Sequence, residues 1–248
     1  MLLKELENYT GQLLEVDRFR DYCPNGLQVE GKSEIRKLVS GVTASLELLK
    51  AAVAAGADAV LVHHGWFWKG EDARVVGVKR ARLEWLLRHG VSLLAYHLPL
   101  DAHPQVGNNA RLAALLGFET GGCFGEQGIA FHGRTIEPQT LAGLAAWVAA
   151  SLDRPPLVIG DAARPIRRVA WCSGGGQDYF EEAVRLGADA FLSGEISERH
   201  VHLARETGVA FIAAGHHATE RYGVQALGEH LAGRFGIEHH YMEIPSPA

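Results

Sequence analysis

The chain has 248 residues, of which 47% are hydrophobic and 8% aromatic, enough to bury the core of one large domain or two small ones. Its formal net charge at pH 7 is -5, from 24 basic and 29 acidic residues, and the sequence contains no basic run. This balance argues against electrostatic binding to nucleic acid or to a membrane surface. We therefore expect neither nucleic acid nor a membrane as a partner.

The first residues, MLLKELENYTGQLLEV, predict an amphipathic helix. No segment approaches the roughly 18 unbroken apolar residues of a membrane span, and no signal peptide is recognisable. Three cysteines (Cys23, Cys123 and Cys172) lie far apart without a CxxC pair, which favours neither a disulfide framework nor a thiolate zinc site. A cytoplasmic location is the expectation.

Short apolar runs alternate with helical patterns along the first half of the chain. The runs predict strands at 37–42, 57–62 and 91–96, and the helical patterns lie at 45–56, 78–90 and 108–117. Each helical pattern stops at a glycine, as helix C-termini prefer, and each strand is almost continuously hydrophobic, as in a sheet covered on both faces. This alternation predicts an α/β fold with mostly parallel strands.

The second half repeats part of this pattern. AVAAGADAVLVHHG at 52–65 is similar to AVRLGADAFLSGEI at 183–196, which indicates either a duplicated βα unit or two similar helix-to-strand turns. Between the halves the residue pattern changes: it predicts a strand at 128–136, a helix at 138–152 and a proline-bounded edge strand at 154–165. We therefore expect two α/β domains, residues 1–125 plus 215–248 and residues 126–214.

Side chains that can carry chemistry follow four of the apolar runs, and ligands of open α/β sheets bind beyond the carboxyl ends of the strands. Two of them, His63 and His64, are adjacent in the chain. Adjacent strand residues point to opposite faces of a sheet, so these two side chains can reach the same site only if the strand has already ended. We expect both to be loop residues. The strand-end residues are His63, His64, His97, Asp101, Glu195, His216, His217 and Glu220.

Imidazole nitrogens and carboxylate oxygens are the usual ligands of zinc, iron and manganese, and a set of three histidines, one aspartate and one glutamate can hold two such ions. Two ions about 3.5–4 Å apart usually need a bridging carboxylate. Glu220 can fill that role beside His216, four residues earlier, or beside His217, three residues earlier. The spacing leaves both pairings open.

Two further motifs have competing interpretations. Trp66, Phe67 and Trp68 can wall a substrate pocket or line a domain or subunit interface. The glycine run Gly174–Gly176 follows a predicted strand and can hold a phosphate on its backbone N–H groups, although neither common phosphate-loop spacing is present.

Six segments together resemble the NIF-three-like family, in its short bacterial branch, whose members are often labelled GTP cyclohydrolase I type 2 homologues. They span almost the whole chain in order: PNGLQVEG (24–31), GVTAS (41–45), HHGWFWKG (63–70), HLPLDAHPQVGNNARLAALLG (97–117), WCSGGGQ (171–177) and GHHATER (215–221). The resemblance implies two interlocked α/β domains, residues 1–125 plus 215–248 being the metal-binding one. It also implies a ring-shaped homohexamer built as a trimer of dimers.

The same resemblance implies a dinuclear centre and selects His216 over His217. The implied ligands are His63, His64, Asp101, His216 and Glu220. His97 lies close to them in the motif and is not counted as a ligand.

Two functions follow as hypotheses. In the first, the chain is a hydrolase in which two divalent ions (zinc, iron or manganese) activate water against an anionic small molecule, nucleotide-like or phosphate-bearing. Glu195 and His97 are then candidates for proton transfer. In the second, the chain forms a non-catalytic metal-binding ring for metal storage, delivery or scaffolding. Five ligands shared between two ions leave open coordination positions, which favours catalysis.

Overall fold

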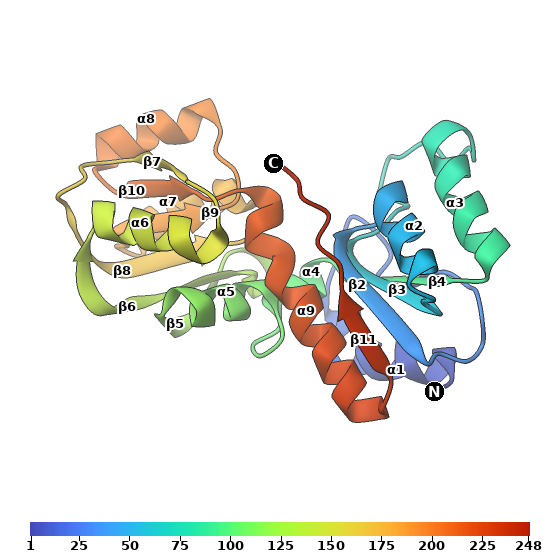
Figure 1. Cartoon of the computed structure of the whole chain (residues 1–248). Coiled ribbons are helices and arrows are strands. Elements are labelled where there is room, and N and C mark those ends of the chain that lie inside the picture. The colour runs from blue at the N-terminus through green and yellow to red at the C-terminus, as the bar shows by residue number, and fades with distance from the viewer. The chain divides into compact units, whose positions relative to one another are not determined.

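The computed structural model describes residues 1–248, which divide into two compact units. Unit 1 comprises residues 1–107 and 223–245, and unit 2 comprises residues 108–222 and 246–248. Each unit has one β-sheet with helices packed against it, so the predicted α/β class is confirmed (Figure 1). No helix combines the length and the apolar character that a membrane span requires.

The sheet of unit 1 has five strands in the order β1-β4-β3-β2-β11. These strands are β1 (Gly26–Val29), β2 (Lys37–Thr43), β3 (Ala59–His64), β4 (Ser92–Ala95) and β11 (Glu238–Tyr241). β1 pairs antiparallel with β4, and the other three pairings are parallel. The carboxyl ends of β2, β3 and β4 therefore meet at one edge of the sheet.

Helices cover both faces of this sheet, as its almost wholly apolar strands require. Leu61 of β3 packs in a cluster with residues of α1 and α9, whereas its neighbours Val60 and Val62 pack with residues of α2 and α3. Figure 1 shows α2 and α3 on one side of the sheet. The helices of the unit are α1 (Leu3–Leu13), α2 (Leu46–Ala54), α3 (Gly77–His89), α4 (Leu98–Ala102) and, from residue 223 onward, α9 (His216–Phe235); a 3-10 turn, η1 (Val16–Arg18), follows α1.

The sheet of unit 2 has six strands in the order β5-β6-β8-β9-β10-β7. They are β5 (Phe118–Phe124), β6 (Ala130–Thr140), β7 (Leu157–Ile159), β8 (Pro165–Cys172), β9 (Ala190–Ser193) and β10 (Ala210–Ala213). Only the β8–β9 and β9–β10 pairings are parallel; the other three are antiparallel. The prediction of mostly parallel strands is correct for unit 1 and wrong for unit 2. There β5 and β6 form an antiparallel hairpin, and the β6–β8 and β7–β10 pairings are antiparallel as well.

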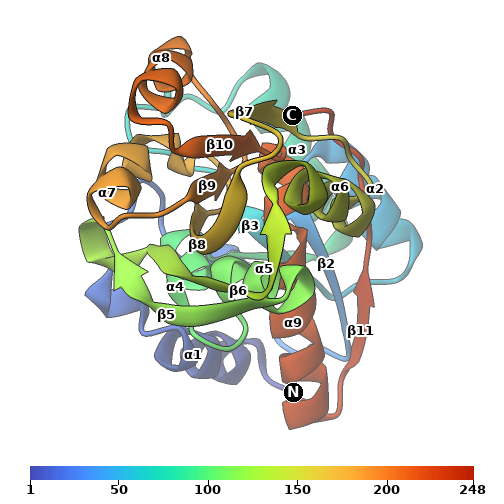
Figure 2. The ribbon, with the colours of Figure 1, turned by 90° about the vertical axis from the view of Figure 1, so that its left-hand side faces the viewer.

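Two pairs of helices enclose the sheet of unit 2 (Figure 2). On one face Trp171 of β8 packs in a cluster with α5 and α6. On the other face Phe191 and Phe211 contact Phe180 of α7, and the ring of His200 from α8 stacks on Phe211. The helices are α5 (Asn108–Leu116), α6 (Leu141–Leu152), α7 (Phe180–Arg185) and α8 (Glu198–Thr207), with the 3-10 turns η2 (Glu126–Gly128) and η3 (Gly176–Tyr179).

The division into units differs from the domain boundaries expected from the sequence. The expected boundary near residue 125 falls inside unit 2, because β5 forms the edge strand of the second sheet and pairs with β6. Residues 215–222, expected in the first domain, also belong to unit 2. The change of composition after residue 121 therefore falls within the β5–β6 hairpin.

The two similar segments of the sequence fold into the same turn. Gly56 after α2 and Gly187 after α7 have φ angles of +76° and +77°, which glycine adopts at little cost. The aspartate two residues later, Asp58 or Asp189, accepts hydrogen bonds from two consecutive backbone N–H groups: those of Arg36 and Lys37 in unit 1, and those of Arg167 and Arg168 in unit 2. Each turn thereby ties a helix end to the neighbouring strand.

Candidate metal centre

His63 and His64 are the last two residues of β3, so the strand runs two residues further than predicted. Their ring centroids nevertheless lie 4.6 Å apart. The ladder between β3 and β4 ends at Val62, and beyond it His64 pairs only with Thr43 of β2. With one neighbouring strand gone, both rings find room at the same edge of the sheet. His63 and His64 are therefore strand residues and not loop residues, but their side chains do lie close together, as expected.

His63 is fully buried and held by the neighbouring strand end. Its Nδ1 donates to the carbonyl oxygen of Tyr96, at 2.9 Å, which directs Nε2 toward the Asp101 carboxylate, 3.5 Å away. Asp101 lies in α4, directly after β4, and is only 5% exposed. A histidine whose Nδ1–H is held by a carbonyl presents Nε2 as a ligand atom, which is how proteins orient metal-binding imidazoles.

His97, between β4 and α4, is held by Asp21, a residue that the sequence reasoning missed. His97 Nδ1 lies 2.7 Å from Asp21 Oδ1, and the other carboxylate oxygen accepts the Leu98 N–H and the Asn25 amide, each at 2.9 Å. Asn25 in turn accepts the His97 backbone N–H at 2.7 Å. Trp68 packs edge-on against the His97 ring, with centroids 5.0 Å apart. The side chain and the backbone of His97 are therefore both fixed.

Asp21 is almost fully buried, with 3% of its side chain exposed. Burial alone would raise the pKa of its carboxyl, but the hydrogen bond and charge of His97, together with the hydrogen bonds from Asn25 and the Tyr22 N–H, lower that pKa. Asp21 is therefore an ionised acceptor at neutral pH. No spacing rule joins residues so far apart in the chain, so nothing in the sequence pointed to this pair.

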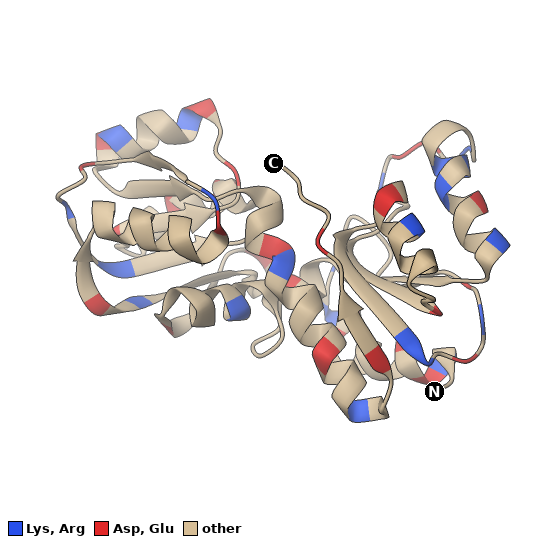
Figure 3. Ribbon diagram, in the orientation of Figure 1, with Lys and Arg blue, Asp and Glu red and all other residues tan.

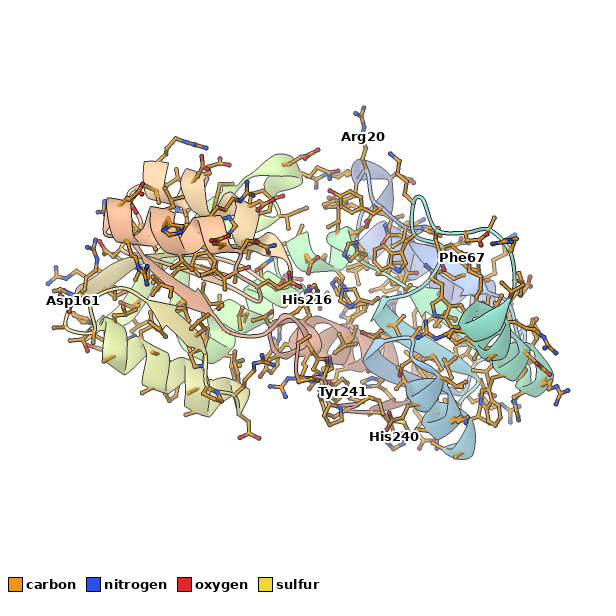
Figure 4. The ribbon with its side chains drawn as sticks, turned by 90° about the horizontal axis from the view of Figure 1, so that it is seen from above. Arg20, Phe67, Asp161, His216, His240 and Tyr241 are labelled. Atoms are coloured by element: carbon orange, nitrogen blue, oxygen red, sulfur yellow. The ribbon has the colours of Figure 1, made fainter.

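In unit 2 the candidate ligands lie at the start of α9, where Figure 4 labels His216. His216 Nδ1 is 2.7 Å from Glu195 Oε1, and Nε2 is 3.1 Å from Glu220 Oε2. The four-residue pairing of His216 with Glu220 is thus present in the structure. Glu195, a candidate for proton transfer, contacts His216 as a residue that orients the ring would. It follows the end of β9, as His64 lies at the end of β3.

Two glycines let the carboxylate of Glu220 and the start of α9 approach the strand ends. A Cβ atom on Gly174, whose φ is +60°, would lie 1.9 Å from Glu220 Oε1. A Cβ atom on Gly194 would lie 2.7 Å from the Cα of His216. The Gly174 N–H donates to Thr219 Oγ1 at 2.9 Å. The structural requirement for glycine at residue 174 is therefore room for Glu220, and its N–H already has a partner within the chain.

The two carboxylates around His216 change its protonation. Burial alone would lower the pKa of His216, but the hydrogen bond and charge of Glu220, followed by those of Glu195, outweigh burial and raise the pKa to about 9. Without a metal ion, His216 therefore carries a proton at neutral pH. A divalent ion held by the same groups could take the place of that proton.

The three aromatic residues after β3, Trp66, Phe67 and Trp68, differ in burial and in the groups that they contact. Trp66 is 5% exposed and belongs to the core, where its Nε1–H donates to the Ala44 carbonyl. Phe67, labelled in Figure 4, is 37% exposed. The Lys79 ammonium lies over its ring, 5.6 Å from the centroid. Trp68 contacts the rings of His64 and His97. Of the three, only Trp68 lies beside candidate ligands.

Known proteins are similar to this chain over almost its whole length. Residues 1–247 match the family described as Duf34/NIF3 (NGG1p interacting factor 3). The GTP cyclohydrolase 1 type 2 homolog of Pseudomonas aeruginosa is 56% identical over 250 residues, which cover 100% of this chain and 97% of that protein. Among solved structures, protein ybgI, described as of unknown function, has a TM-score of 0.97 at 49% identity, and TTHA1606 from Thermus thermophilus has 0.90 at 34%; both comparisons cover 100% of each chain.

Proposed function

Because the chain belongs to the Duf34/NIF3 family, we propose that it is a dinuclear metal-dependent hydrolase acting on a nucleotide-like or phosphate-bearing substrate. Two divalent ions (zinc, iron or manganese) would be held by His63, His64 and Asp101 of unit 1 and by His216 and Glu220 of unit 2. When bound, they would supply the Lewis acidity that activates water for hydrolysis.

The donor set fits such ions. Imidazole nitrogens and carboxylate oxygens suit zinc, iron and manganese, and an outer partner holds one ring nitrogen of a histidine in each unit. The observation that carries the proposal is His216, fixed between the Glu195 and Glu220 carboxylates with its pKa raised to about 9. The two carboxylates strongly favour a positive charge at the His216 imidazole, which lies at the carboxyl edge of a sheet. A metal site needs such an environment before its metal binds.

Charge supports an anionic substrate. The two ions would bring four positive charges against the carboxylates of Asp101, Glu195 and Glu220, which leaves about one net positive charge in the proposed site. Elsewhere, acidic and basic residues are interspersed along the helices of each unit (Figure 3). The nucleotide class is supported by the name of the Pseudomonas aeruginosa relative, GTP cyclohydrolase 1 type 2 homolog.

We further propose that the chain assembles as a homohexamer, a trimer of dimers, in the cytoplasm. Support for self-association comes from apolar side chains of α3 and of the two residues before it, which remain half exposed or more. They are Val75 (52%), Val76 (59%), Val78 (66%) and Leu87 (63%). Burial of such side chains against another copy would remove apolar surface from water.

The test of the catalytic proposal is His64→Ala. We expect metal content to fall and hydrolysis of GTP, other nucleotides or phosphoesters to be lost, while the fold persists, because His64 is at a strand end and only partly buried. His89→Ala, at an exposed end of α3, is the matched control and should change neither quantity. Metal content is measured by elemental analysis and turnover by a substrate screen. A fully metallated protein that leaves every substrate untouched would favour the non-catalytic metal-binding ring.

A further inference from the structure

His97 is constructed in the same way as the candidate ligands beside it. His63 Nδ1 is held by the Tyr96 carbonyl at 2.9 Å, and His64 Nδ1 lies 3.3 Å from the Thr43 hydroxyl. His97 Nδ1 lies 2.7 Å from the Asp21 carboxylate, the strongest acceptor of the three. In each ring the outer partner occupies Nδ1, so Nε2 is the nitrogen presented to a ligand.

The three rings also converge. The centroid of His97 lies 5.0 Å from that of His63 and 5.7 Å from that of His64, and each ring offers a nitrogen within 4.8 Å of the other two. All three residues belong to unit 1, so this arrangement depends on one compact unit alone. Trp68 packs against both His64 and His97, which limits rotation of the two rings.

A second grouping, His97 with Asp21 and Cys23, has a weaker claim to a metal ion. Both oxygens of Asp21 already accept hydrogen bonds, from His97, Asn25 and two backbone N–H groups. The Cys23 thiol is buried beside the Asp21 charge, and burial followed by that charge raises its pKa to about 12. A thiol that keeps its proton is a poor ligand. His97 therefore pairs chemically with His63 and His64.

From this geometry we infer that His97 is an additional metal ligand, which completes a three-histidine donor set with His63 and His64, and that Asp21 is the positioning residue that directs its Nε2 to the ion. This inference rests on the proposed metal centre and differs from the ligand set that family resemblance implies. Nitrogen-rich sites favour borderline ions such as zinc over manganese, so His97 also biases the choice of metal.

The test uses the full chain, stripped of metal by a chelator and titrated with Zn²⁺, Mn²⁺ or Co²⁺ alone. We expect His97→Gln to weaken Zn²⁺ binding at one of the two ions at least tenfold, to weaken Mn²⁺ binding less, and to change the Co²⁺ absorption spectrum. Asp21→Asn keeps the size of the side chain and loses its charge. It should lower Zn²⁺ affinity about 10–100-fold, as loss of an outer-shell partner does, and perturb the same Co²⁺ bands.

Two controls separate this inference from the proposal on which it rests. His89→Gln, an exposed histidine of α3, should match the unmodified chain, and His63→Gln should weaken metal binding. Unchanged affinity and spectrum in His97→Gln, with weakened binding in His63→Gln, would overturn the role of His97 and leave the metal centre intact. No binding by the unmodified chain would instead refute the centre itself. If His97→Gln does not fold, an unaltered Co²⁺ spectrum in Asp21→Asn would overturn the inference.

Discussion

At the scale of single residues, Gly174 decides whether Glu220 can occupy its place. We predict that Gly174→Ala costs about 1–3 kcal/mol of the free energy of unfolding, because its φ of +60° is strained for alanine and the new Cβ would collide with the Glu220 carboxylate. The displaced carboxylate should also reduce metal content. Denaturant unfolding and elemental analysis measure the two effects.

Gly56→Ala is the matched control for this substitution. Its φ is +76°, yet nothing lies within 4 Å of the added Cβ, so it tests backbone strain without a collision. It should cost about 1 kcal/mol and leave metal content unchanged. Equal stability losses with full metal content in both variants would show that Gly174 serves only its backbone conformation.

His216 makes the stability of the metal-free protein depend on pH. Its pKa is about 9 in the folded chain against an ordinary 6.5, so the folded state favours the protonated ring. The stabilisation is fully present below pH 6.5 and is lost as the pH rises through 9. The shift corresponds to at most about 3 kcal/mol, and partial exposure of the side chain, 27%, reduces the expected loss to about 1–2 kcal/mol.

The measurement is denaturant unfolding of metal-free protein at pH 6 and pH 9.5. His216→Gln removes the titrating ring and should reduce the difference between the two pH values by that amount. An identical pH dependence in His216→Gln and the unmodified chain would contradict the assignment of the titration to His216.

Sequence patterns single out candidate residues that end apolar runs and give no signal for the residues that support them. His63, Asp101 and His216 were identifiable because strand ends converge in α/β sheets, whatever the intervening sequence. Asp21 was not, since its loop precedes β1 and reaches His97 only through tertiary packing. Gly174 was noticed as part of a glycine run, but the need for glycine there depends on Glu220, which no local pattern could show.

At the scale of elements, the turn shared by α2–β3 and α7–β9 explains why the two units place chemistry at corresponding positions. In each unit an aspartate, Asp58 or Asp189, fixes the start of the middle strand against its neighbour. The backbone N–H groups of Ser92 and Ala210 then donate to the carbonyl oxygens of these aspartates, which sets the third strand. The same three-strand parallel core therefore ends in His63 and His64 in one unit and in Glu195 in the other.

Periodicity predicted these elements because apolar runs between glycine-terminated helices have few alternative folds. It was less informative for β5, β6 and β7. Most of their residues are exposed or half-buried, and their antiparallel pairings depend on chain connections and edge positions that hydrophobicity does not specify. The expected boundary near residue 125 falls between two strands that pair with each other, β5 and β6.

At the scale of the whole molecule, the proposed hexamer would bury apolar residues that are exposed on unit 1. The fraction exposed is 59% for Val76 and 66% for Val78, although the rest of the unit has a well-packed core. Single exposed apolar residues are ordinary, but four of them lie between residues 75 and 87, and the proposed assembly would cover them. The four are Val75, Val76, Val78 and Leu87.

The last prediction is that the double substitution Val76→Asp with Val78→Asp reduces the assembly from six chains to a smaller species. Burial of an unpaired carboxylate in an interface costs several kcal/mol, enough to dissociate contacts of ordinary size. Leu186→Asp, at an exposed apolar residue of unit 2, is the control and should leave six chains together. Sedimentation velocity at micromolar concentration measures the mass of each species. A stable monomer of the unmodified chain under these conditions would refute the hexamer, whereas a hexamer that persists in the double variant would place its interfaces elsewhere than on α3.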